Sequence, residues 1–260
     1  MKKGMSNSRA QTTIFIVIAV IIIVTAVAIF LARNTETSTN ISSILAKLEV
    51  RTEASQVESS ILDCIEQTSQ DALTVIGIQG GYYEKPERSF DLEWTFIPYY
   101  YDEGDLLMPT QETIEKEIAS YVDDNLHFCI EELDYDEFDV SFKDSKTSVH
   151  IEEREVSFET MLASSFEKSE LSSDFDITHS VHIESALSDI LDVARYITDS
   201  HQEDPDMFCI SCVADMAEEK NLYVDMLDFG EETTTLVVIS ENYTSSESYV
   251  FEFLNRYPKL

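Results

Sequence analysis

The sequence predicts an α+β fold with an N-terminal transmembrane helix and helical stalk/hairpin, then an extracytoplasmic antiparallel sheet with inserted helices. Three observations lead to this prediction. Residues 14–32 are almost uniformly apolar, residues 41–78 repeat apolar side chains at helical spacing, and most segments after residue 134 alternate apolar and polar residues. Because helices and strands fall into successive blocks, the pattern is typical of α+β proteins.

These observations divide the chain into four parts. We expect a cytoplasmic N-terminus at residues 1–12, a transmembrane helix at 13–33, a stalk and helical hairpin region at 34–133, and an α+β extracytoplasmic domain at 134–260.

The apolar stretch Ile14–Ala32 contains no charge and is long enough to cross a hydrocarbon core of about 30 Å as a helix. Lys2, Lys3 and Arg9 precede it, whereas Arg33 alone follows closely. The positive-inside rule therefore places the N-terminus in the cytoplasm and the remainder outside, in a single-pass protein of the cell membrane.

A secretory signal peptide is the alternative to a permanent anchor. Signal peptides have an apolar region of about 7–15 residues and a small-residue cleavage site. The present stretch is longer and ends in "FLAR", so the sequence favours an anchor.

The junction "RAQTTIF", from Arg9 to Phe15, resembles the leader of archaeal type IV pilin-like proteins. The resemblance implies cleavage between Ala10 and Gln11 on the cytoplasmic side, with the apolar stem left attached. Typical pilins carry a glutamate at the fifth position of the mature chain, which pairs with a neighbour's terminal amine during assembly. This chain has Phe15 there, so we favour an anchor and retain a pilin-like subunit as an alternative.

The chain is strongly acidic, with 51 Asp and Glu, 17 Lys and Arg, and a net charge of −34. Such a field repels nucleic acids and anionic lipid surfaces, so we expect no nucleic-acid partner. The simplest explanation is a halophilic environment, where salt screens the repulsion and carboxylates keep the surface hydrated. A cell surface rich in divalent cations is the alternative.

Helical spacing predicts two long helices before residue 134. The first ends at Gly80-Gly81 and the second begins after Met108-Pro109-Thr110, with "DLEWTFIPYYY" between them as a strand ending near Pro98. The apolar positions of the first helix are Ile41, Leu45, Leu48, Ala54, Val57, Ile61, Cys64, Ile65, Ala72 and Ile76.

The second half alternates with a period of two, which indicates half-buried antiparallel strands. The expected strands are "EFDVSF", "SVHIEE", "REVSFETML" and "FDITHSVHIE", followed after two helices by "LYVDMLDF", "TTLVVIS" and "SYVFEFL". The two helices are "SALSDILDVARYITD" and "FCISCVADMAEEKN".

The order of several segments resembles an uncharacterised family of single-pass membrane proteins from small-genome archaea. The segments are "RAQTTIFI", "VESSILDCIEQTSQDALTVIGIQGGYY", "MPTQETIEKEIASYVDDNLHFCI" and "CISCVADMAEEKNLYVD". The resemblance implies an archaeal origin, an anchor and an external domain, and it implies no particular chemistry.

The four cysteines predict disulfides, because cysteines outside the membrane tend to oxidise. Cys64 and Cys129 each lie on the apolar stripe of a predicted helix, so two facing helices could bring them together. We favour Cys64–Cys129 with Cys209–Cys212 among the three connectivities. On the chain-entropy model, a loop of the first size contributes roughly 4 kcal/mol.

The spacing of Cys209 and Cys212 also admits thiol-disulfide oxidoreductase activity, since a helix N-terminus favours a thiolate. Redox enzymes of the thioredoxin kind place this motif after a strand, whereas here the loop "DSHQEDPDMF" precedes it. We therefore favour a structural bridge and keep the redox site and a four-cysteine zinc site as alternatives.

An aromatic cluster is the main candidate for a binding surface: Trp94, Tyr99, Tyr100 and Tyr101 stand beside carboxylates, an arrangement that can stack on sugars or anchor a protein partner. Packing against the helices is the alternative. Asn40 and Asn242 begin N-glycosylation sequons that face outward in the expected topology.

No catalytic signature occurs in the chain, and we expect no catalytic residues, no cofactor and no metal site. The sequence thus predicts a membrane-anchored extracellular structural or interaction protein of an acidic archaeal cell surface, with a protein or glycan partner. A pilin-like subunit and a thiol-disulfide oxidoreductase are the alternatives.

Overall fold

The computed structural model describes residues 54–133, 139–168, 171–203, 209–230, 233–241 and 249–258. The expected transmembrane helix, the leader residues Ala10 and Gln11, and both sequons lie outside these ranges. Within them, no helix has the length and apolar composition needed to cross a membrane. Ser55–Leu260 form one compact unit, so the boundary expected between residues 133 and 134 lies inside it.

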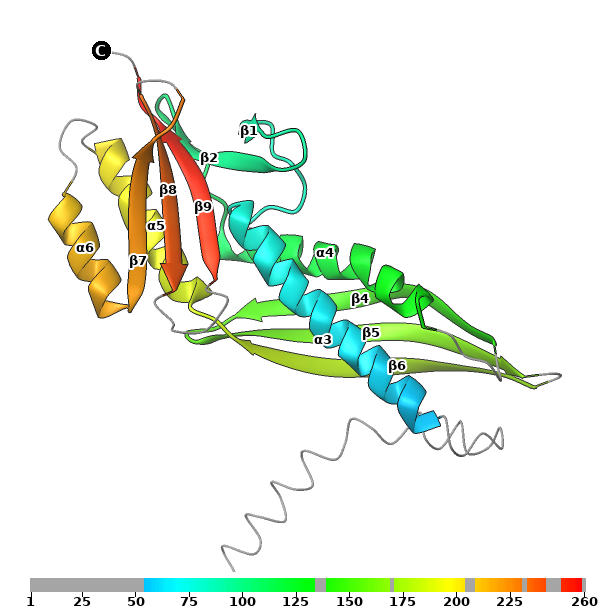
Figure 1. The fold of residues 1–260 in the computed structure, drawn as a ribbon. Coiled ribbons are helices and arrows are strands. Elements are labelled where there is room, and N and C mark those ends of the chain that lie inside the picture. Colours follow the sequence, from blue (N-terminus) through cyan, green and yellow to red (C-terminus); the bar gives the residue numbers. More distant parts are fainter. Residues whose placement is uncertain are drawn as a thin grey trace, which may run out of the picture. The chain divides into compact units, whose positions relative to one another are not determined.

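This unit is α+β, as predicted from the sequence, and its described part contains four helices and two separate sheets (Figure 1). The helices are α3 (Ala54–Ile78), α4 (Gln111–Glu131), α5 (Leu187–Glu203) and α6 (Ile210–Glu219). The strands are β1 (Ser89–Asp91), β2 (Phe96–Asp102), β3 (Asp105–Leu106), β4 (Asp139–Ile151), β5 (Glu155–Lys168), β6 (Leu171–Glu184), β7 (Leu222–Asp228), β8 (Thr234–Glu241) and β9 (Val250–Arg256).

The larger sheet has the order β1-β2-β9-β8-β7, and β3 pairs with β2 at the side. All its pairings are antiparallel except that of β2 with β9, which is parallel and aligns Asp102 with Arg256. The expectation of one antiparallel sheet is therefore wrong. Strands β4–β6, which precede the inserted helices α5 and α6, form a sheet separate from that of β7–β9, and the larger sheet is mixed.

The smaller sheet is an antiparallel meander of β4, β5 and β6. The sequence predicted two strands where β4 is continuous, because the register shifts between Phe142 and Ser145. Such an irregularity breaks the alternation of apolar and polar residues without ending the strand.

One face of the smaller sheet is buried and carries the alternate side chains of β5, among them Val156, Phe158 and Leu162. Helix α4 binds the edge residue Ile151 through two of its side chains. The Gln111 amide donates to the Ile151 carbonyl at 2.9 Å, and the Ile151 N–H donates to a carboxylate oxygen of Glu115 at 2.9 Å. These contacts fix α4 against β4.

Helices α3 and α4 are joined by the disulfide Cys64–Cys129, whose Cα atoms lie 5.7 Å apart. The structure also contains Cys209–Cys212, so its two disulfides have the connectivity that the sequence favoured. The Thr113 N–H donates to the Thr110 hydroxyl at 3.2 Å, which caps α4 at its predicted start.

Helix α3 ends at Ile78, just before the predicted stop at Gly80-Gly81, and Gly80 has a φ of +55°. A Cβ atom at Gly80 would lie 2.6 Å from the carbonyl oxygen of Glu252 and 2.5 Å from the Pro98 ring. Glycine is therefore required here both by its backbone conformation and by the close approach of β9.

Candidate functional site

The described part of the molecule contains a groove of about 910 Å³ between α6 and β7. Its lining combines polar and apolar surface in similar proportions. The lining residues are Ile210, Val213, Ala214, Ala217, Glu218, Asn221, Leu222, Tyr223, Val224, Met226, Asp228, Thr235 and Tyr257.

Helix α6 forms one wall because its apolar residues recur at helical spacing. Val213 and Ala217 are buried, whereas Ile210, Ala214 and Glu218 are exposed and follow one another at intervals of four residues along the groove. Ile210 and Ala214 therefore give α6 a small accessible apolar surface, which Glu218 continues as an acidic position.

Strand β7 forms the other wall and is the last strand in the order of its sheet. Leu222, Val224 and Met226 alternate along it and line the groove. Tyr223 and Leu227 alternate with these residues and are both exposed, and Tyr223 also contributes to the lining. In the described part of the chain β7 pairs only with β8, so no described strand occupies its second edge.

The lining contains two acidic residues, Glu218 and Asp228, and no lysine, arginine or histidine. The neighbouring Lys220 turns to α5, where its ammonium group bonds Asp189 and lies 3.2 Å from Asp192. Burial by itself lowers the pKa of Lys220, but the two aspartates more than offset this and raise it. The groove is consequently negative.

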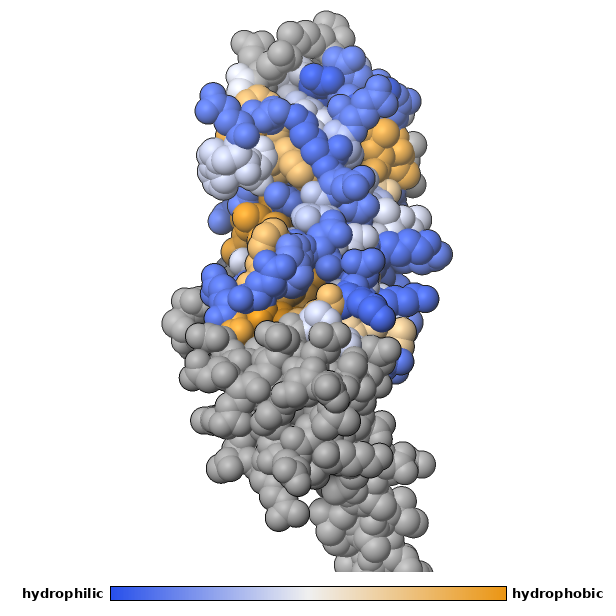
Figure 2. Space-filling view, turned by 90° about the vertical axis from the view of Figure 1, so that its right-hand side faces the viewer, coloured by the Kyte–Doolittle hydropathy of each residue, from blue (hydrophilic) through white to orange (hydrophobic). Residues whose placement is uncertain are grey.

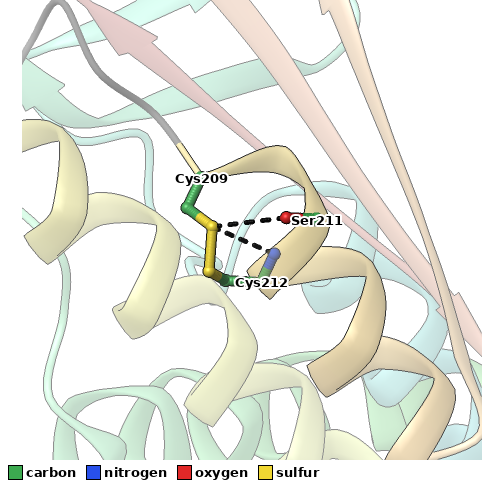
Figure 3. Close-up of a disulfide and its surroundings, with 3 residues drawn as sticks. All are labelled: Cys209, Ser211 and Cys212. Carbon is green, nitrogen blue, oxygen red and sulfur yellow. Dashed lines mark hydrogen bonds between the residues drawn. A yellow bond between two sulfur atoms is a disulfide. The ribbon is translucent and has the colours of Figure 1, made fainter.

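The disulfide Cys209–Cys212 adjoins the groove at the N-terminus of α6 (Figure 3). Cys209 is the N-cap, and its sulfur accepts the Cys212 N–H at 3.2 Å. The Ser211 hydroxyl lies 3.6 Å from the same sulfur and must be the donor, because a disulfide sulfur has no hydrogen. Cys212 is exposed and Cys209 is half-buried.

The four residues of the predicted aromatic binding surface do not lie together on the surface. Tyr100 is 0% and Tyr101 is 4% exposed; the Tyr100 ring stacks on Phe253 at 4.3 Å and its hydroxyl donates to the Gly80 carbonyl. These two tyrosines are core residues because β2 lies inside the sheet rather than at its edge. Trp94, by contrast, is 81% exposed.

Tyr99 is half-buried, and the Arg256 guanidinium lies over its ring at 4.9 Å. Figure 2 shows the side of the molecule that faces right in Figure 1. Hydrophilic residues cover most of the coloured surface there, and hydrophobic residues form a few separate areas.

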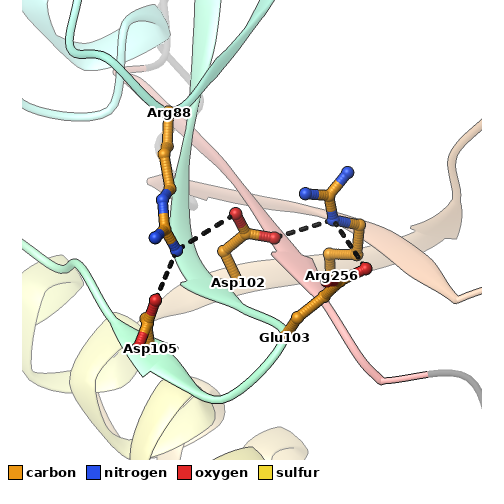
Figure 4. A network of polar contacts seen from close by, with 5 residues as sticks. All are labelled: Arg88, Asp102, Glu103, Asp105 and Arg256. Atoms are coloured by element: carbon orange, nitrogen blue, oxygen red, sulfur yellow. Dashed lines mark hydrogen bonds and ion pairs between the residues drawn. The ribbon is translucent and has the colours of Figure 1, made fainter.

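A charged network that the sequence did not predict joins β2 to β9 (Figure 4). The buried carboxylate of Asp102 accepts from Arg256 Nε at 2.7 Å and lies 3.4 Å from an Arg88 nitrogen, which in turn lies 2.7 Å from Asp105. Hydrogen bonding to Asp102 raises the pKa of Arg256. Since the charges compensate one another, the network serves to hold the parallel pairing.

No protein-family model, no curated protein and no solved structure matches the chain. In the ranges that the structure describes, no group of three or more His, Cys, Asp or Glu residues is arranged to hold a metal ion. The candidate site accordingly rests on the geometry of the α6–β7 groove and of its disulfide.

Proposed function

We propose that this chain is a membrane-anchored extracytoplasmic interaction protein that binds an extended segment of a partner protein in the groove between α6 and β7. The anchor is inferred from the apolar stretch Ile14–Ala32, and the two disulfides are consistent with an oxidising location. The observation that carries the proposal is the edge of β7 that no described strand occupies, beside a groove that combines apolar and acidic side chains.

An open edge strand offers backbone N–H and C=O groups to an added strand, while neighbouring pockets select alternate side chains of the ligand. The groove provides both features along the seven residues of β7. A protein partner therefore fits this surface better than a glycan, because only a polypeptide can continue the sheet.

The charge of the groove defines the chemistry of the partner. Its charged lining residues, Glu218 and Asp228, are acidic, and the chain carries a net charge of −34. The complementary ligand is an extended segment in which basic side chains alternate with apolar ones.

The test uses the full chain in mild detergent and a fluorescent peptide of about eight residues, which matches the length of β7, with alternating lysine and valine. We expect the fluorescence anisotropy of this peptide to rise on binding. A second peptide has the same sequence but N-methyl groups on alternate amides, which block strand pairing and keep the charges. Equal binding of the two peptides would contradict strand addition.

Two pairs of matched variants locate the binding surface. Ala214→Arg places a large cation in the groove, whereas Asp215→Arg changes the charge of the same helix by more but lies outside the lining. We expect only Ala214→Arg to weaken binding tenfold or more, on the order of the 1.4 kcal/mol that a lost apolar contact and charge repulsion can cost. Similarly, Glu218→Gln should weaken binding more than Glu219→Gln.

The anchor is tested separately by the N-terminal residue of the protein isolated from its own membranes. An intact start at Met1 or Met5 is the expected result. A start at Gln11 would instead favour the pilin-like alternative, and the search would then turn to a filament.

A further inference from the structure

We propose that the Cys209–Cys212 disulfide is redox-active and oxidises paired cysteine thiols of polypeptides bound in the α6–β7 groove. Neither cysteine lines this groove, but their chain neighbours Ile210 and Val213 do, so the disulfide lies within one residue of the lining along the chain. The choice of substrate rests on the proposed function, whereas the reactivity of the disulfide does not.

The two sulfur atoms are unequal in a way that favours exchange. Cys209 is the N-cap of α6, and its sulfur accepts hydrogen bonds from the Cys212 N–H and the Ser211 hydroxyl. Both donors and the positive end of the helix dipole stabilise a thiolate at this sulfur. Cys209 is therefore the better leaving group, and a disulfide breaks faster when the leaving thiolate is stabilised.

Accessibility supports the same direction of attack, since Cys212 is exposed whereas Cys209 is half-buried. The thiolate of a substrate cysteine attacks Sγ of Cys212, the bond between the two protein sulfurs breaks, and its electron pair remains on Sγ of Cys209. The substrate's second thiolate then attacks the substrate sulfur of this mixed disulfide and releases Cys212. One substrate dithiol is oxidised, and the protein gains two electrons and, at equilibrium with water, two protons.

The other disulfide provides an internal contrast. Cys64–Cys129 joins two packed helices, and Cys64 is only 3% exposed. It closes a sequence separation of 65 residues, against 3 for Cys209–Cys212, so its loss releases far more chain entropy. Cys64–Cys129 is suited to stabilising the fold, whereas Cys209–Cys212 constrains only the first turn of α6.

The experiment mixes the full oxidised chain in mild detergent with an equimolar lysine–valine peptide that contains two reduced cysteines. The reaction is stopped with acid, free thiols are alkylated, and both molecules are analysed by mass spectrometry. We expect the peptide to become oxidised while alkylation appears on Cys209 and Cys212 and is absent from Cys64 and Cys129. The variant Cys209→Ser/Cys212→Ser should give no such oxidation.

The role of Ser211 separates a reactive disulfide from one that is merely accessible. Ser211→Ala should slow peptide oxidation by about 2- to 10-fold, the range expected for loss of one hydrogen bond to the leaving sulfur. Ser211→Thr keeps the hydroxyl and should restore the rate. If accessibility alone governs the reaction, the unchanged protein, Ser211→Ala and Ser211→Thr should oxidise the peptide at equal rates. That result would overturn the proposal.

Failure of this inference differs from failure of the proposed function. A peptide that binds but remains reduced, or is oxidised no faster than by the double cysteine variant, refutes the redox activity alone. If the lysine–valine peptide and its N-methylated form are oxidised at equal rates, the groove is not the substrate site. The disulfide is then still redox-active, so only the proposed substrate site is refuted.

Discussion

The charged network between β2 and β9 predicts a definite order of stabilities for three variants. The Asp102 side chain is 7% exposed, while those of Arg256, Arg88 and Asp105 are 29%, 45% and 62% exposed. A substitution that leaves the buried carboxylate without its main partner must therefore cost most. A substitution that removes the carboxylate should cost less, because the arginines that remain are accessible to water.

The magnitudes follow from these exposures. Arg256→Met removes the 2.7 Å bond to Asp102 and leaves the buried Asp102 carboxylate without its main partner. We expect the free energy of unfolding to fall by about 3 kcal/mol. This is the low end of the range for buried pairs, because Arg88 remains near Asp102. Asp102→Asn loses the same charged hydrogen bond without stranding a buried charge, at about 1.5–2 kcal/mol. Asp105→Asn breaks a solvent-exposed pair and should cost about 0–1 kcal/mol.

The assay is urea unfolding of the full chain in mild detergent, with the transition midpoint compared at constant slope. Raising the salt concentration should abolish the effect of Asp105→Asn and largely preserve that of Arg256→Met, because buried pairs are screened little. If Asp102→Asn and Arg256→Met are no less stable than Asp105→Asn, the network does not hold the parallel strands and the reasoning is refuted.

Three further predictions concern the backbone, pH and salt. Gly80→Ala should lower the free energy of unfolding by more than Gly230→Ala: both glycines have positive φ, a conformation costing about 1–2 kcal/mol for alanine, but only at Gly80 does a Cβ meet other atoms. Equal losses in urea unfolding would contradict this. Burial raises the pKa of Glu252, so the folded state binds the proton more tightly, and stability from this group is lost as pH rises from the ordinary glutamate value through the raised one. Glu252→Gln should thus stabilise the protein at neutral pH and have little effect below the ordinary value, as measured by urea midpoints across pH. Finally, lowering NaCl from about 2 M to about 0.1 M should lower the thermal midpoint of so acidic a chain, and an unchanged midpoint would remove the argument for a halophilic environment.

Features that depend on neighbouring residues could be predicted from the sequence. The cap of α4 at Thr110 and the end of α3 just before Gly80-Gly81 were predicted correctly, because both are set by short-range hydrogen bonding and backbone conformation. The pairing of β2 with β9 was not predicted. Asp102 and Arg256 are separated by 154 residues, and nothing in either segment specifies a parallel partner.

The aromatic segment also shows that burial cannot be predicted from local sequence alone. Tyr100 and Tyr101 could be placed in a strand, but whether they are buried depends on β9, which covers an edge of β2 that local sequence leaves open. The groove was missed because it requires β7 to end the sheet. The available signal was the interval of four residues from Ile210 to Ala214 and Glu218, which gives α6 a second accessible stripe.

The position of β9 has a consequence for the order in which the chain matures during synthesis. Strand β9 lies between β2 and β8, yet it follows every other described strand in the sequence. The α3–α4 pair and the β4–β6 meander are made of segments that emerge earlier, so they can assemble first. The edge of β2 that pairs with β9 therefore stays unpaired while more than half of the chain is synthesised. Chaperone contact and early oxidation of Cys64 with Cys129 would matter most during that interval.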